Sequence, residues 1–170
     1  MKKVLTSVCV IALFLFGLGK SSTNPTDSRF GKTVTEFKIT VPASYKTQNQ
    51  MSSFFKKYSD TFDVFDGEDL MNANYQNVSA QLVPGKTYTV RVFPIMKDGV
   101  TPAECVNWLK SQNALLTGAQ GLSLFFEMKK GSFPQSKFVY SLDEKNKLPK
   151  CMDSPFIPRI RFMPLANEWS

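Results

Sequence analysis

The chain of 170 residues contains no histidine, so the side chains that could carry chemistry are its carboxylates and its three cysteines. The missing histidine excludes Ser-His-Asp and Cys-His catalysis, HExxH metalloproteases, histidine-ligated metals and histidine-based pH switches. A cysteine nucleophile would have to act without its usual base. The catalytic chemistry that remains is acid–base work by a pair of carboxylates, as in glycosidases.

Four carboxylates are available for such a pair: Glu104, Glu127, Asp143 and Glu144. Hydrolysis of a glycoside needs two of them held about 5 Å or about 9 Å apart. The sequence gives no reason for that spacing, because Glu104 belongs to a helix cap and Glu127 to a predicted strand. We therefore assign no catalytic residue, and whether the chain is an enzyme stays open.

Two other motifs resemble ligand sites but have the wrong spacing or order. The acidic residues Asp60, Asp63 and Asp66 recur at every third position, whereas an EF-hand loop places ligands at positions 1, 3 and 5. The glycines Gly118 and Gly121 follow a predicted helix, whereas a phosphate-binding loop precedes one. We interpret the first as a solvated acidic loop and the second as a helix C-cap and turn. The sequence thus predicts neither a metal nor a cofactor.

Residues 1–19 have the pattern of a secretory signal peptide. Lys2 and Lys3 precede the uncharged run 4–18, and Gly17 and Gly19 place small residues before a cleavage site at residue 20. The run is short for a membrane-spanning helix, which needs about 20 residues. A retained anchor stays the alternative, and only then is a membrane contact expected. Cleavage removes two lysines and lowers the formal net charge from +7 to +5. We expect an exported protein, periplasmic or extracellular.

Export leaves two cysteines, Cys105 and Cys151, because Cys9 belongs to the leader. An even pair of cysteines in an oxidising compartment predicts a disulfide bond. That bond would close a loop of about 46 residues and stabilise the fold by roughly 4 kcal/mol in the chain-entropy model. Two separate buried thiols are the alternative, because the sequence does not show whether the Cβ atoms approach each other.

The rest of the chain alternates between strand and helix signals. The polar segment 20–31 predicts a flexible lead-in. Capping residues Thr101 and Glu104, with Pro102 at the first helical position, predict a helix over 101–116, and an i, i+3, i+4, i+7 apolar stripe predicts one over 47–58. Alternating apolar residues predict strands at 34–41, 86–93, 122–128, 137–142 and 157–163, the last an edge strand flanked by prolines.

Composition and alternation together predict the fold class. Hydrophobic residues make up 42% and charged residues 21%, which is ordinary for one globular domain, here residues 32–170. Each predicted strand has one polar face, whereas strands of a doubly covered parallel sheet are apolar on both faces. We expect an α+β fold: a two-layer sandwich with an about five-stranded, mostly antiparallel or mixed sheet that carries two main helices on one face.

The polar faces of these strands gather positive charge. In the predicted register, one face of the sheet presents Glu127 and five cations, which are Lys38, Arg91, Lys137, Arg159 and Arg161. Because arginine pairs with carboxylate and phosphate in a bidentate manner, this face is a candidate docking surface for a protein or an anionic envelope polymer. A solvated face of a basic chain is the alternative. No nucleic acid is expected, because an exported protein rarely meets it and the aromatic pattern of single-strand binders is missing.

Residues 80–149 carry a set of short motifs: VPGKTY, a helix start with Glu104-Cys105, a Ser-Gln pair, GAQGL and a Ser-x-Asp-Glu-Lys segment. In these motifs the chain resembles a group of short uncharacterised bacterial proteins. The resemblance implies a bacterial chain and one folded unit, and it implies no activity and no site residue.

These observations predict a small exported envelope protein. A non-enzymatic domain that binds another macromolecule, as an inhibitor or immunity protein does, fits the predicted leader, the disulfide and the cationic face together. A carboxylate-based hydrolase of envelope glycans is one alternative. A membrane-tethered structural protein is the other, if the leader is retained. The sequence predicts neither the oligomeric state nor the ligand.

Overall fold

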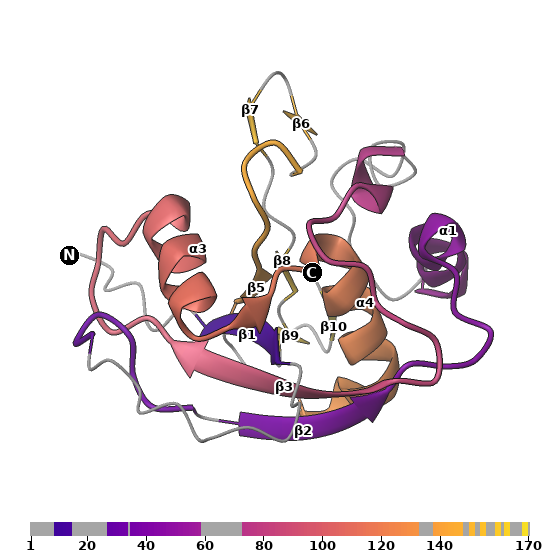
Figure 1. Ribbon diagram of the computed structural model, residues 1–170, viewed down its shortest axis with the longest axis horizontal. Coiled ribbons are helices and arrows are strands. Elements are labelled where there is room, and N and C mark those ends of the chain that lie inside the picture. The colour runs from indigo at the N-terminus through magenta and orange to yellow at the C-terminus, as the bar shows by residue number, and fades with distance from the viewer. Residues whose placement is uncertain are drawn as a thin grey trace.

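The computed structural model describes residues 9–14, 27–33, 35–58, 73–132 and 138–147, and the short pieces 150–151, 154–155, 159–160, 162–163 and 168–169. Over these residues the chain combines helices with a β-sheet, which confirms the predicted α+β class (Figure 1). The acidic stretch 60–69 lies outside the described residues.

Among the described residues the main sheet has six strands rather than about five, and its spatial order is β2-β3-β1-β5-β8, with β4 also paired to β1. The β1–β5 pair is parallel and the other pairs are antiparallel, so the sheet is mixed. Its strands are β1 (Cys9–Phe14), β2 (Thr35–Thr40), β3 (Thr87–Pro94), β4 (Ala114–Leu115), β5 (Val139–Ser141) and β8 (Arg159–Ile160). Two separate pairs join β6 (Lys150–Cys151) to β7 (Ser154–Pro155) and β9 (Phe162–Met163) to β10 (Glu168–Trp169).

Strands β2 and β3 form where alternation predicts them, and their apolar positions face the core. Ile39 on β2 and Val90 and Val92 on β3 are at most 1% exposed. Thr89, on the opposite side of β3, is also buried, although the sequence predicts a solvent-facing position there. The polar face of this strand is therefore partly covered.

Strand β5 lies within the predicted strand at 137–142, and both of its sides carry buried residues, because Leu142 directly after it is buried as predicted. Val139 and Ser141 are buried, whereas Tyr140, predicted to face inward, is half-buried. The strand lies between β1 and β8 rather than at the edge of the sheet. Because both faces of such an inner strand are partly covered, alternation says less about which face is buried.

Helix α1 spans Thr47–Tyr58 as predicted, and the short 3₁₀-helix η1 (Ala73–Gln76) follows it after an interval. Helix α3 spans Pro102–Ser111 and begins at the predicted capping box. The backbone N–H of Glu104 donates to Thr101 Oγ1 at 3.3 Å, and the backbone N–H of Thr101 donates to Glu104 Oε2 at 2.8 Å. The two residues thus satisfy each other's backbone donors at the helix start.

The predicted end of this helix near residue 116, with Gly118 after it, is wrong. Helix α3 ends at Ser111, and Asn113 takes the left-handed conformation, with φ of 57°, that the sequence assigns to Gly118. Asparagine adopts this conformation more readily than most residues with a side chain. The chain then turns into the short strand β4 rather than continuing as a helix.

The predicted strand at 122–128 is also wrong, because this segment is helical. Helix α4 spans Gly118–Lys129 and leads into the 3₁₀-helix η2 (Lys130–Ser132). All of its residues from Gly118 to Phe126 are buried. Ser123 also fits a helix, since its hydroxyl donates to the carbonyl of Gln120 at 3.0 Å. A helix buried on all sides has no polar stripe, so the segment's alternation resembles that of a strand.

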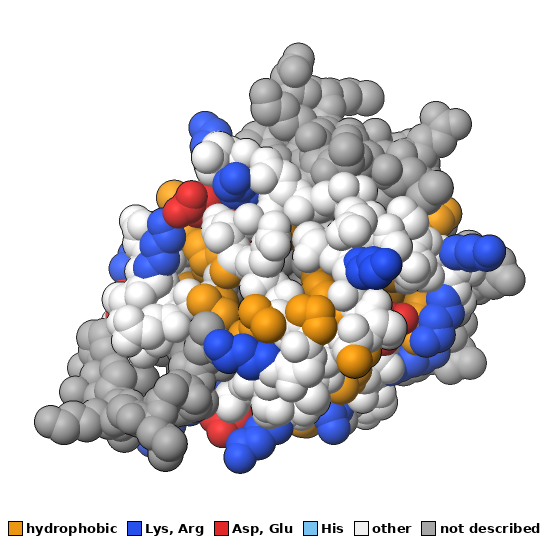
Figure 2. Space-filling view, turned by 45° about the vertical axis from the view of Figure 1, so that its right-hand side comes forward, with side chains coloured by type: hydrophobic (Ala, Val, Ile, Leu, Met, Phe, Trp, Pro, Cys, Tyr) orange, Lys and Arg blue, Asp and Glu red, His pale blue; other side chains and the backbone are white. Residues whose placement is uncertain are grey.

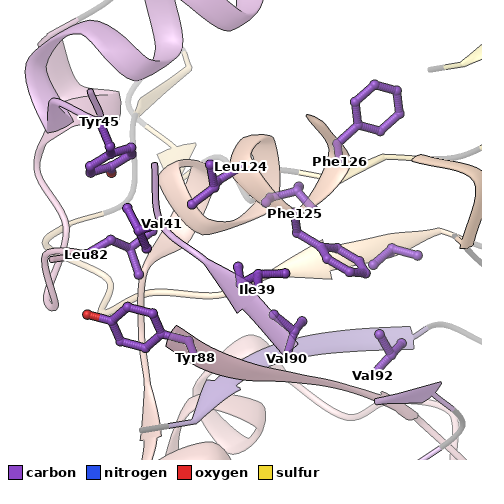
Figure 3. Packing of buried hydrophobic residues seen from close by; sticks show 12 residues of the cluster. Ile39, Val41, Tyr45, Leu82, Tyr88, Val90, Val92, Leu124, Phe125 and Phe126 are labelled. Carbon is purple, nitrogen blue, oxygen red and sulfur yellow. The ribbon is translucent and has the colours of Figure 1, made fainter. Parts of the chain in front are cut away.

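Two adjacent phenylalanines of α4 join the sheet to α1 (Figure 3). Phe125 points toward Ile39 and Val90, whereas Phe126 points away from the sheet. The Phe126 ring lies edge-on to the ring of Tyr58 on α1, with ring centroids 5.3 Å apart. The main hydrophobic core therefore lies between α4 and strands β2 and β3, with α1 packed on the far side of α4.

A second hydrophobic cluster lies around α3. Trp108 stacks on Phe30, with ring centroids 4.2 Å apart, and meets Phe93 of β3 edge-on. Phe30 is buried and forms an isolated β-bridge with Ile95. The last residues of the stretch predicted as a lead-in, 27–31, therefore pack against the domain.

Strand β1 consists of residues from the predicted leader. It pairs with β3 over six residue pairs and with β5 over three. Cleavage of residues 1–19 stays a prediction. In the chain that still carries them, residues 9–14 occupy the middle of the sheet (Figure 1).

Candidate functional site

The β2–β3 register brings two of the predicted docking cations onto one face of the sheet. Glu36 lies opposite Arg91, and Lys38 lies opposite Thr89. Because side chains alternate along a strand, Lys38 and Arg91 point to the same side. Lys38 is exposed and Arg91 is half-buried. In the view of Figure 2, which labels no residue, lysine and arginine side chains lie around a central group of hydrophobic side chains.

Arg91 is engaged within the sheet. Its Nε donates to Glu36 Oε2 at 2.5 Å across the strand pair. Lys38 forms no ion pair with any residue that the structure describes. On this pair of strands Lys38 therefore offers a more available positive charge than Arg91.

The other members of the predicted face are placed differently or lie outside the described part of the chain. Arg159 is in β8, opposite Tyr140 of β5, and its side chain is not described. Lys137 and Arg161 lie outside the described residues. The prediction that Glu127 lies on a sheet face is wrong, because it belongs to α4. Its carboxylate accepts a hydrogen bond from Gln50 Nε2 at 2.8 Å and pairs with Lys57 Nζ at 3.4 Å.

Among the described residues, Asp143 is the most buried carboxylate. It lies directly after β5, and 2% of its surface is exposed. Its oxygens accept hydrogen bonds from the backbone N–H and hydroxyl of Ser79 and from the backbone N–H of Glu144. The Ser79 N–H to Oδ2 distance is 3.1 Å and the Glu144 N–H to Oδ1 distance is 2.7 Å. This carboxylate thus joins the exposed loop 77–80 to the end of β5.

Burial is the main influence on the pKa of Asp143. It raises the pKa of this carboxyl above its usual value, and the hydrogen bonds from Ser79 and Glu144 oppose that rise. The neighbouring Glu144 behaves in the opposite way. Its side chain lies at the surface 2.5 Å from Lys110 Nζ, and this pairing lowers its pKa. The pKa values of these two adjacent carboxylates therefore shift in opposite directions, because Asp143 faces the interior and Glu144 faces a lysine.

Gly118 explains why the start of α4 lies so close to this carboxylate. Its φ is 47°, and a Cβ atom on it would lie 3.2 Å from Asp143 Oδ2. Only glycine combines this backbone conformation with that approach at low cost. Gly118 and Asp143 belong to two of the short sequence motifs, GAQGL and Ser-x-Asp-Glu-Lys.

Two buried hydrogen bonds of Gln120 also hold the first turn of α4 in place. Gln120, with 0% exposed, accepts a hydrogen bond from Tyr45 at 3.0 Å and donates one to the backbone carbonyl of Tyr75 at 2.9 Å. The sequence indicates no role for Gln120, because it places this residue in a turn. The buried role of Asp143 also escapes sequence reasoning, since its partner Ser79 is 64 positions away. No local signal marks Asp143, because the charged residues Glu144 and Lys145 follow it directly and the segment resembles a solvated loop.

Cys105 is buried on the inner side of α3 and carries a free thiol. Its burial raises the pKa of the thiol to about 11, so little reactive thiolate forms near neutral pH. The backbone of Cys151 forms part of β6, but its side chain lies outside the described residues. The Cys105–Cys151 bond therefore stays a prediction.

Within the described part of the chain, no group of three or more carboxylates and cysteines is placed to hold a metal ion. Among the same residues, no helix is both long and apolar enough to cross a membrane. Comparisons with protein-family models, with curated proteins and with solved structures give no match for this chain.

Proposed function

We propose that the chain is a small exported bacterial envelope protein that binds another macromolecule without acting on it chemically. Its domain would be an α+β unit with α4 and α1 on one side of the sheet, while α3 packs on Phe93 at the other side. The part of the outward face that carries Lys38 and Arg91 would serve as the docking surface for an anionic partner, because Phe93 on the same side of β3 packs against Trp108 of α3. The observation that carries this proposal is the placement of exposed Lys38 on the same face as Arg91.

Charge supports the choice of an anionic partner. The formal net charge is +7, and it stays positive at +5 after loss of Lys2 and Lys3 with the leader. A positive surface on a positive protein raises the rate at which anionic partners arrive. An inhibitor- or immunity-like protein would use such a face against an acidic patch, and an envelope polymer would use its phosphates or carboxylates.

The test variant reverses two charges on this face, and a control variant reverses two charges elsewhere. The two variants therefore have the same net charge. The test variant is Lys38→Glu/Arg159→Glu, and the control is Lys46→Glu/Lys56→Glu, whose exposed lysines lie before and within α1. Poly-glutamate serves as a probe for an acidic protein patch, and a phosphate-rich envelope polysaccharide serves as a probe for a polymer. Titration calorimetry at low ionic strength measures both, because salt screens exposed charges.

We expect the test variant to bind at least one probe about tenfold more weakly than the wild type, while the control changes by about twofold or less. Melting temperatures of all three proteins should agree, since the three replaced lysines are exposed and exposed charges contribute little to stability. Equal weakening by both variants would show a general charge effect and would remove this face from consideration.

One observation favours a second candidate, a carboxylate-based hydrolase of envelope glycans. Asp143 has the raised pKa expected of a general acid. Its carboxylate is 2% exposed and already accepts hydrogen bonds from Ser79 and Glu144, so a substrate would reach it only after movement of loop 77–80. Release of reducing ends from purified envelope glycan, abolished by Asp143→Asn, would favour this candidate over binding.

A further inference from the structure

The central place of β1 has a consequence for the exported protein. Cys9–Phe14 lies between β3 and β5, antiparallel to the first and parallel to the second (Figure 1). It also pairs with β4 at its last two residues. Three strands therefore depend on backbone hydrogen bonds to this one segment, so its loss would affect the whole middle of the sheet.

The inference drawn from this rests on the proposed export. Cleavage after Gly19 would remove residues 9–14 and leave an open slot between β3 and β5. Along β3 this slot would expose one side of a strand that has six residue pairs with β1. Unpaired backbone N–H and C=O groups in a sheet favour pairing with another strand. Beside the slot lie Val90, Val92 and Val139, whose side chains are all fully buried.

We propose that the mature domain fills this slot with an extended strand donated by a partner protein. The donated strand runs antiparallel to β3 and parallel to β5, in the register of residues 9–14. Strand addition of this kind takes affinity from backbone hydrogen bonds and specificity from alternate side chains. This names the kind of macromolecule that the exported domain binds, namely a protein with a free apolar segment.

The register sets the chemistry of the donated segment. Its positions opposite Val92 and Val90, held here by residues 11 and 13, lie beside two valines that face the main core. Cross-strand neighbours share one face of a sheet, so apolar side chains are required at these two positions. The segment that fills the slot in the structure, CVIALF, is uncharged over its whole length. A partner segment should therefore be about six residues long, uncharged and without proline.

The donor is a separate protein because the described strands of this chain are already paired. In the C-terminal part, β8 pairs with β5 on the side away from β1, β9 pairs with β10, and β6 pairs with β7. A second mature copy would also lack its leader, so among its described residues it could donate a strand only by unpairing one of these. A segment that is free in its own protein has no such cost.

The experiment uses the mature protein recovered after native export, with its start confirmed by intact mass. The probe is a synthetic peptide of residues 7–17, extended by lysines at both ends for solubility. The control peptide carries Ile11→Pro and Leu13→Pro, because proline lacks the N–H that a central strand donates. Hydrogen exchange is measured along β3, where alternate amides point toward β2 and toward the slot.

We expect the slot-facing amides of β3 to exchange rapidly in the mature protein alone and about 100-fold more slowly with the probe peptide. The proline peptide should give no protection, and the amides that face β2 should change little. If the mature protein is unfolded alone, we expect the probe peptide and not the proline peptide to restore its structure by circular dichroism.

Three results would overturn the proposal. Slot-facing amides that are already protected without peptide would show that the mature chain fills the slot itself or with a second copy. Equal effects of the two peptides, or no effect of either, would show that no strand is accepted. Retention of residues 1–19 in the exported protein would overturn both this proposal and the cleavage on which it rests, whereas failure of the charge-reversal test would affect the proposed cationic face alone.

Discussion

Replacing Asp143 by alanine should destabilise the fold strongly, because this buried carboxylate joins two segments of the chain. It accepts hydrogen bonds from three donors: the N–H and the hydroxyl of Ser79, and the N–H of Glu144. A hydrogen bond to a charged group contributes about 1.5–3 kcal/mol. Two effects reduce the sum. Burial disfavours the charged form, and Ser79 is exposed, so its donors can bind water. We expect a net loss of about 2–4 kcal/mol for Asp143→Ala.

Urea denaturation followed by circular dichroism measures this loss as a change in the free energy of unfolding. Ser79→Ala removes one of the three donors and should cost about 0.5–1.5 kcal/mol. In the Asp143→Ala background the same Ser79 substitution should cost almost nothing, since its partner is gone. A cost below about 0.5 kcal/mol for Asp143→Ala would refute the assignment of Asp143 as a structural acceptor.

The pH dependence provides a second, independent check. The folded-state pKa of Asp143 is raised above its unfolded value, so its contribution to stability is complete below the unfolded pKa and is lost as the pH rises through the folded pKa. Asp143→Asn does not titrate at this position, while every other carboxylate is unchanged. We therefore expect wild type to gain stability relative to Asp143→Asn as the pH falls from about 7 toward about 4. A change in the opposite direction would mean that hydrogen bonding, not burial, dominates this carboxyl.

Three further predictions concern the core, the start of α4 and the cysteines. Phe125→Ala should cost about 3–5 kcal/mol in urea denaturation, because Phe125 is fully buried between α4 and the sheet. Gly118→Ala should cost about 1–2 kcal/mol, since φ is 47° and the added Cβ meets Asp143, and the cost should fall in the Asp143→Ala background. In exported protein unfolded without reductant, Cys105 should resist alkylation because of its predicted bond to Cys151, and labelled Cys105 would contradict that bond.

The elements that the sequence predicts well are those bounded by residues with one clear local role. The capping residues Thr101 and Glu104 place the start of α3, and both hydrogen bonds of the box form. Alternation places β2 and β3, and the apolar stripe with Met51 and Tyr58 places α1. Such signals act within a few residues, so they are readable without knowledge of the rest of the fold.

Helix α4 shows where this kind of reasoning fails. Its residues from Gly118 to Phe126 are all buried, so the contrast between a polar and an apolar face is lost. The two glycines at its start resemble a turn in sequence. In the structure, Gly118 is needed because a distant carboxylate, that of Asp143, lies against it. The same distance in sequence hides the contacts of Gln120 with Tyr45 and Tyr75.

The candidate site is predictable only in part, for a similar reason. Alternation correctly places Lys38 and Arg91 on one face, but the ion pair of Arg91 with Glu36 depends on the β2–β3 register, which the sequence does not specify. Glu127 leaves the predicted face as soon as its segment becomes a helix. A predicted surface is therefore wrong wherever the secondary structure of its residues is predicted wrongly.

Residues 9–14 satisfy two sets of requirements at once, and this explains why sequence reasoning finds only one of them. A signal peptide needs an uncharged apolar run, and a strand buried in the middle of a sheet needs the same composition. The two roles exclude each other in time, because a segment paired along six residues of β3 is not free for processing. Export thus requires that the leader be recognised before β1 pairs with β3 and β5. If cleavage removes it as proposed, the mature sheet would need another strand in the same place.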